Sequence, residues 1–112
     1  MLHQMKLKSS PFHKIKNGTK TIELRLNDEK RQQVQVGDFI EFTMIDDTSQ
    51  KLTTRVTALH NFDSFAELYE NLPKEKIGYA PNEIPNPNHM DKYYPREKQA
   101  QYGVLGIELT LE

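Results

Sequence analysis

Three charged residues and a turn glycine lie close together in the first quarter of the chain. Gly18, Lys20, Glu23 and Arg25 fall within the segment GTKTIELR. On an extended strand, Glu23 and Arg25 are roughly 6 to 7 Å apart and on the same face, so they can orient one another or grip one ligand between them. Lys20 lies at the start of that strand, where its ammonium group reaches the same ligand. The spacing therefore predicts a charged binding site.

A short helix and a strand are predicted to position these groups. The helix covers residues 11–17, with Phe12 and Ile15 facing inward and Gly18 ending it in a left-handed conformation. The strand covers residues 21–26, and its alternation of apolar and charged residues puts the two charges on one face and the apolar side chains on the core face. Those core-facing residues are Ile22, Leu24 and Leu26.

The pattern Gly-x-Lys-x-x-Glu-x-Arg resembles the signature of the ASCH domain family, which is related in fold to the PUA domains of RNA-modifying enzymes. The segments 36–42, 93–94 and 102–107 also look like the short prokaryotic members of that family. The resemblance implies one domain over residues 1–112. Its expected fold class is α+β, a PUA-like mixed β-barrel of five or six short strands with two or three helices.

The remaining pattern fits that fold. Strands are predicted over residues 39–45 and 51–60 as antiparallel neighbours, and a last strand over 104–111. A helix over 63–72 is predicted to lie on the barrel and to contribute nothing to the site. The segment 80–89 holds three prolines and three asparagines, which predicts a loop acting as a mobile flap over the site. Residues 90–101 are predicted to be helical, with a restart at Pro95.

Composition narrows the classes of protein. With 112 residues, 36% hydrophobic and 28% charged, the chain has the composition of an ordinary soluble domain. It has no apolar run long enough to cross a membrane and no signal peptide, so we expect a cytoplasmic protein that does not act at membranes. Cysteine is absent, the four histidines show no metal-ligand spacing, and no cofactor motif occurs, so we expect neither metal nor cofactor.

Charge is distributed unevenly. Residues 1–31 carry eight Lys or Arg and three acids, a charge of +5, whereas residues 32–112 carry seven and thirteen, a charge of −6. One interpretation is a basic face that meets phosphates; the other is that the charges interleave in space and cancel. The sequence carries no prediction of oligomeric state.

The leading hypothesis is a cleft that binds RNA or a nucleotide. Lys20 would contact a phosphate or a base carbonyl, Arg25 would present its planar donor fork, and Glu23 would orient Arg25 or accept from an exocyclic amine. RNA is favoured over duplex DNA because no helix is predicted to enter a major groove. The predicted binding residues are Lys16, Gly18, Lys20, Glu23, Arg25 and Tyr93.

Four other interpretations stay open. The resemblance also implies a small hydrolase of acylated nucleosides such as N4-acetylcytidine, or a ribonuclease. In the hydrolase branch a lysine, a threonine and a distant glutamate act; Lys20 matches the lysine, but Glu23 stands where the threonine falls, so Lys20 as base and Glu23 are the catalytic candidates. A protein-interaction module is the third possibility. Alternatively, Glu23 and Arg25 form only an exposed ion pair worth little.

Overall fold

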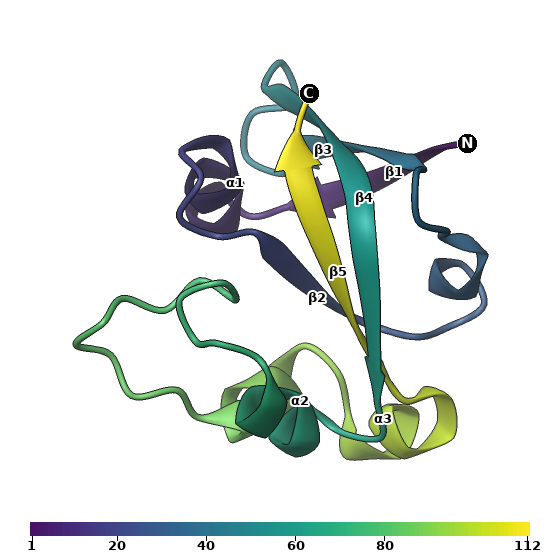
Figure 1. Ribbon diagram of the computed structural model, residues 1–112, viewed down its shortest axis with the longest axis vertical. Coiled ribbons are helices and arrows are strands. Elements are labelled where there is room, and N and C mark those ends of the chain that lie inside the picture. The colour runs from purple at the N-terminus through teal and green to yellow at the C-terminus, as the bar shows by residue number, and fades with distance from the viewer.

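The computed structural model describes residues 1–112 and is built around a single sheet of five strands (Figure 1). The strands occur in the spatial order β1-β3-β4-β5-β2. β1 pairs with β3 in parallel, and every other pairing is antiparallel. Their bounds are β1 (Leu2–Leu7), β2 (Ile22–Leu26), β3 (Phe39–Met44), β4 (Lys51–Phe62) and β5 (Val104–Leu111).

The first and last strands of this order, β1 and β2, are not paired with each other, so the sheet curls without closing. A side chain spans the gap instead: Nη2 of Arg25 on β2 donates to the carbonyl of Lys6 on β1 at 2.7 Å. Polar residues of the motif therefore lie where the barrel is left open.

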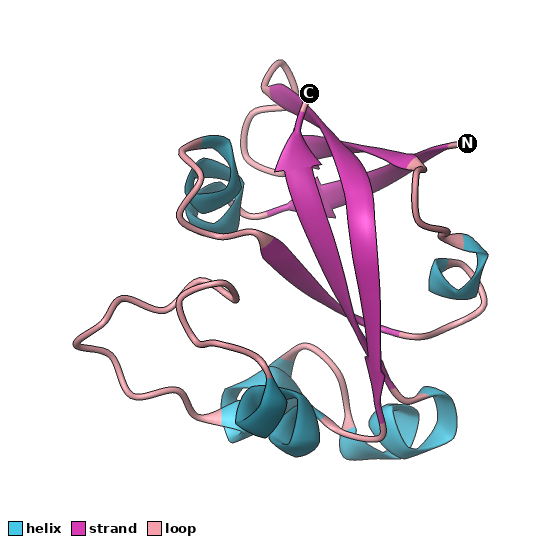
Figure 2. Ribbon diagram, viewed as in Figure 1, coloured by secondary structure: helices cyan, strands magenta, loops and turns pink.

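Helices cover the ends of the sheet (Figure 2). The three α-helices are α1 (Ser9–Lys16), α2 (Phe65–Asn71) and α3 (Arg96–Tyr102), and two 3₁₀ helices, η1 (Arg31–Gln33) and η2 (Pro87–Lys92), lie in the connections. In Figure 1, α1 lies at one end of the sheet and α2 and α3 at the other. No helix has the length and apolar character needed to cross a membrane.

The hydrophobic core has two parts. Phe12 and Ile15 of α1 are buried, as predicted, in a cluster that fills the inside of the curled sheet. The second cluster lies between β2, α2 and η2, and contains the predicted apolar face of β2. Its buried members are Ile22, Leu24, Leu26, Phe65, Leu68, Ile77 and Val104. The rear of the motif strand is thus anchored by packing, which fixes the position of its charged face.

Most predicted elements are confirmed, with shifts of one or two residues at their ends. β3 and β4 are antiparallel neighbours, β5 has the predicted bounds, and Gly18 has φ +85° directly after the first helix. The predicted loop 80–89 is too long: it ends at Asn86, whose side chain accepts from the amide of Asn88 and starts η2. Proline at the first turn of η2 fits a helix start, which is why the segment turns helical there.

Candidate functional site

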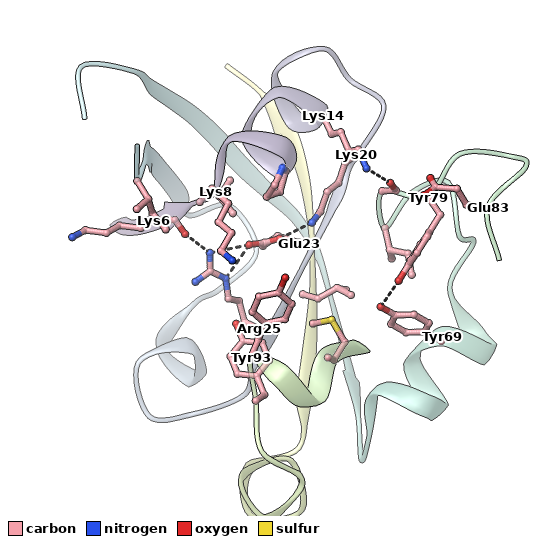
Figure 3. Close-up of a pocket in the computed structure, with 18 residues that line it drawn as sticks. Lys6, Lys8, Lys14, Lys20, Glu23, Arg25, Tyr69, Tyr79, Glu83 and Tyr93 are labelled. Carbon is pink, nitrogen blue, oxygen red and sulfur yellow. Dashed lines mark hydrogen bonds and ion pairs between the residues drawn. The ribbon is translucent and has the colours of Figure 1, made fainter. Parts of the chain in front are cut away.

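A cleft of about 430 Å³ opens beside β2 (Figure 3). Its walls come from six parts of the chain: β1 with α1, β2 with the turn before it, the residue after β3, α2, the segment 77–83, and η2 with the two residues after it. This volume lies in the range of small-molecule sites and suits one nucleotide-sized ligand.

An ion-pair centre of Lys20, Glu23 and Arg25 lies in the middle of the cleft. Nζ of Lys20 is 2.8 Å from Oε1 of Glu23, and Nε and Nη2 of Arg25 are 2.9 and 2.8 Å from Oε2. The side chains are only 10%, 6% and 12% exposed. Glu23 thus holds two cations in fixed positions, and the exposed-pair interpretation is wrong.

Burial and charge act in opposite directions on this centre. Burial disfavours the Glu23 carboxylate and is the largest single influence, but Lys20 and Arg25, through charge and hydrogen bonds, together outweigh it and lower the pKa of Glu23 to about 2. Burial likewise disfavours the Arg25 guanidinium, yet Glu23 reverses the effect and the pKa of Arg25 is raised. Both groups are therefore charged across the physiological range.

The turn before β2 brings Lys20 back over the strand. After α1 the amide of Lys20 donates to the carbonyl of Lys14 at 3.0 Å, and the next two amides, of Thr21 and Ile22, both donate to the carbonyl of Lys76 at 2.9 Å. Since Gly18 supplies the positive φ that reverses the chain, its contribution is to the geometry of the turn.

Gly78 fixes Lys20 from the other side. It has φ +108°, and a Cβ at this position would lie 3.2 Å from Cδ of Lys20. Its carbonyl accepts from Nζ of Lys14 at 2.8 Å, which ties the segment to α1. The lysine stem therefore runs in a slot beside Gly78, where a Cβ would press against it.

The cleft has a basic rim on the β1 side. Lys6 and Lys8 line it, and Nζ of Lys8 lies 5.1 Å from the ring centroid of Tyr93, within cation–π range. Tyr93 is 52% exposed, so its ring is available to a ligand.

The opposite wall is aromatic. Tyr69 of α2 and Tyr79 line the cleft there with their hydroxyls 2.9 Å apart. Tyr94 lines the cleft near Arg25 and stacks on Phe65 with ring centroids 5.7 Å apart. Burial raises the pKa of Tyr94 and outweighs the positive charge of Arg25, which acts to lower it. The expectation that the helix over 63–72 would contribute nothing to the site is therefore wrong, because Tyr69 lies at its cleft-facing edge.

Of the six predicted binding residues, four line this cleft and two do not. Lys16 is exposed near the end of α1, pointing to solvent, and Gly18 lies in the turn. The four lining residues are Lys20, Glu23, Arg25 and Tyr93. Sequence reasoning missed Tyr69 and Tyr79, whose only signal was an aromatic residue in a helical apolar pattern and another near a glycine.

No group of three or more His, Asp or Glu side chains in the structure is arranged to hold a metal ion. Two carboxylates line the cleft: Glu23 has both oxygens engaged by Lys20 and Arg25, and Glu83 accepts from the amide of Ala80. The groups available to a ligand in the cleft are therefore fixed cations, hydroxyls and aromatic rings.

Several solved protein structures are similar to this one. The hypothetical protein PH0355, known from a crystal structure, is 31% identical over the full length of both chains with a TM-score of 0.85. Protein PF0455 from Pyrococcus furiosus, solved in solution, is 32% identical with a TM-score of 0.74, covering 99% of this chain and 97% of that one. The S128A mutant of ZmASCH from Zymomonas mobilis shares the fold at 11% identity, with a TM-score of 0.70 over 97% of this chain and 67% of that one.

These likenesses confirm the predicted α+β, PUA-like fold class. No curated protein matches the chain. The model of the ASCH domain matches residues 5–112, which is nearly the whole sequence. The chain therefore belongs to the ASCH domain family.

Proposed function

We propose that this protein binds single-stranded RNA or a nucleotide in the cleft centred on Lys20, Glu23 and Arg25. The observation that carries the proposal is the combination, in one cavity of nucleotide size, of fixed cations with exposed aromatic faces. Single-stranded nucleic acids are bound by this pairing, because phosphates need cations and unstacked bases need a flat partner.

The charge of the cleft favours an anionic ligand. Five cations and two acids line it, a formal charge of +3, although the whole chain carries −1. The cations are Lys6, Lys8, Lys14, Lys20 and Arg25, and the acids are Glu23 and Glu83.

Each member of the ion-pair centre has capacity left for a ligand. The hydrogen bonds of Arg25 use Nε and Nη2 and leave Nη1, and Lys20 uses Nζ for one carboxylate oxygen. Lys20 and Arg25 would donate to phosphate or base oxygens while Glu23 holds both in place. A centre already paired in this way binds without reorganising its side chains.

The same geometry favours binding over deacylation. A general base must be able to take up a proton near neutral pH, whereas Glu23 has a pKa of about 2 and Lys20 is paired to it as an ammonium ion. In the deacylase alternative, Lys20 would have to be released from Glu23 before it could act.

The test is fluorescence anisotropy with a labelled single-stranded RNA hexamer across a salt series. The informative variant is the double change Lys6→Ala and Lys8→Ala, because both side chains are exposed and their loss leaves no buried charge unpaired. Lys16→Ala with Lys51→Ala is the matched control, since it removes the same charge outside the cleft.

We expect the rim variant to bind about tenfold more weakly and with a shallower salt dependence, and the control to bind as the wild type does. Equal losses in both variants would mean that only overall charge matters, and would overturn the proposed site. A gel of the RNA after incubation reports cleavage, which would add a ribonuclease activity.

A further inference from the structure

The cleft has two chemically different ends (Figure 3). Lys6 and Lys8 lie at one end of the cleft, beside Arg25, whereas Tyr69 and Tyr79 lie at the other end, near Lys14 and Glu83. A ligand that fills the cleft therefore meets exposed lysine side chains at one end and, at the other, two neutral phenols beside Lys14, whose ammonium group is already bonded to the carbonyl of Gly78. A nucleotide has the same division, with a charged phosphate at one end and a planar neutral base at the other.

The tyrosine end carries a defined hydrogen-bonding capacity. The hydroxyls of Tyr69 and Tyr79 are 2.9 Å apart, and the hydrogen bond between them is the only one that either makes within the protein. Two phenols carry two hydrogens, and their mutual bond uses one. The pair therefore presents one free O–H donor and at least one free oxygen lone pair, side by side.

The orientation of this pair is fixed by packing. The two rings meet edge to face at 71° with centroids 5.8 Å apart, and both are partly buried against the second core cluster. Burial, followed by the bond to Tyr79, raises the pKa of Tyr69, so its hydroxyl stays protonated in all ordinary buffers. Either tyrosine can be the donor, so the order of donor and acceptor can reverse.

An adjacent donor and acceptor is the pattern on the Watson–Crick edge of an unpaired base. Uracil has a ring N–H between two carbonyl oxygens, so it matches the hydroxyl pair in either order. A base with a methyl group on that ring nitrogen has lost the donor and leaves a tyrosine oxygen without a partner.

We infer that Tyr69 and Tyr79 are specificity-determining residues: their hydroxyl pair binds the unsubstituted Watson–Crick edge of one base, while the phosphate of the same nucleotide lies against Lys8 and Arg25. This inference rests on the proposed function and narrows it to one nucleotide unit bound in a fixed direction. It also excludes paired bases, whose edge is already occupied.

Isothermal titration calorimetry with three probes tests this. Uridine 5′-monophosphate carries both ends of the ligand, its N3-methyl derivative lacks the ring donor, and ribose 5-phosphate lacks the base. The variants are Tyr69→Phe and Tyr79→Phe, each of which removes one hydroxyl and keeps the ring. Tyr102→Phe is the matched control, because the hydroxyl of Tyr102 bonds to Glu29 outside the cleft.

We expect the wild type to bind uridine monophosphate about tenfold more tightly than its N3-methyl derivative. Tyr69→Phe and Tyr79→Phe should each lower the affinity for uridine monophosphate by about five- to tenfold and leave that for ribose 5-phosphate unchanged. Tyr102→Phe should match the wild type with all three probes.

The inference is overturned if the wild type does not distinguish the methylated from the unmethylated nucleotide, or if the cleft variants weaken ribose 5-phosphate equally. It is also overturned if no nucleotide binds. The RNA hexamer distinguishes a failure of this inference from a failure of the proposed function. If the hexamer binds in a way that depends on Lys6 and Lys8 but no base selectivity is found, only this inference fails. If neither hexamer binding nor base selectivity is found, the proposed function fails as well.

Discussion

Glu23 organises the site at the scale of single residues. A carboxylate on a side chain that is only 6% exposed is costly to bury, and it is tolerated here because each oxygen meets a cation at 2.8 Å. Such an arrangement fixes the positions of Lys20 and Arg25 more than it adds net stability, since the two cations would otherwise repel each other. Replacing one member should therefore do more damage than the pairwise contacts suggest.

Glu23→Gln tests this through pH. The folded-state pKa of about 2 lies below the ordinary 4.5, so the unfolded chain takes up the proton first. The contribution of Glu23 is fully present above pH 4.5 and is lost as pH falls through 2. We expect Glu23→Gln to lose about 3 kcal/mol of unfolding free energy at pH 7. The measurement is urea unfolding of both proteins from pH 2 to 7.

Asp38 also has a pKa lowered to about 2, first by its hydrogen bond to His3, so the wild-type curve alone does not isolate Glu23. The difference between the wild type and the variant cancels that contribution. This difference should shrink steadily between pH 4.5 and 2. A difference that stays constant over this range would mean that Glu23 is not held as a buried anion.

At the scale of elements, the sequence predicted correctly those features that depend on residues close together in the chain. The alternation of Ile22, Leu24 and Leu26 gave the buried face of β2, and Gly18 gave the turn before it. The strand β1 was not predicted, because its partner β3 is more than thirty residues away and its pairing is parallel. Non-local pairing of this kind leaves little trace in a six-residue segment.

The tyrosine wall escaped sequence analysis for a related reason. In a helical pattern, Tyr69 is equivalent to the buried Phe65 and Leu68 beside it. Whether such a residue fills a core or lines a cavity depends on what the chain brings opposite, and here that is Tyr79 from the loop after α2. The ion-pair centre was predictable because its three residues lie within six positions.

Gly78 lies against Lys20 and accepts a hydrogen bond from Lys14 of α1, so its replacement tests what keeps Lys20 in position. Gly78→Ala and Gly37→Ala both put a side chain at positive φ, +108° and +95°, so each should lose about 1 kcal/mol of unfolding free energy. Only the Cβ at position 78 meets Lys20, at 3.2 Å, whereas nothing lies within 4 Å of the one at 37. Binding of the RNA hexamer should therefore weaken several-fold in Gly78→Ala alone.

Stability is measured by urea unfolding and binding by anisotropy, on the same samples. If Gly78→Ala binds RNA as Gly37→Ala does, the position of Lys20 does not depend on the slot beside Gly78. A loss of binding in both variants would instead trace the effect to general destabilisation.

At the scale of the whole molecule, the uneven charge of the sequence becomes a local feature. Five of the eight Lys and Arg residues among residues 1–31 line the cleft, so these charges do not simply interleave and cancel. The structure measures 34 × 33 × 25 Å, and one cleft of about 430 Å³ is a small part of its surface. The basic region is therefore confined, which limits how much of an RNA strand the molecule can hold.

RNA length and strandedness test this confinement. Because one base enters the cleft and its neighbours meet the lysine rim, affinity should rise up to about three nucleotides and then level off, with a salt slope of about −2. A twelve-nucleotide strand should bind at most about threefold more tightly than the hexamer, because the longer strand only offers the cleft more positions at which to bind. A duplex should bind at least about tenfold more weakly, since a base must first be unpaired. Anisotropy with labelled 1-, 3-, 6- and 12-nucleotide RNAs and a 12-base-pair duplex measures all of these. Affinity that keeps rising with length, or a duplex that binds equally well, would point to an extended surface and away from a single-nucleotide cleft.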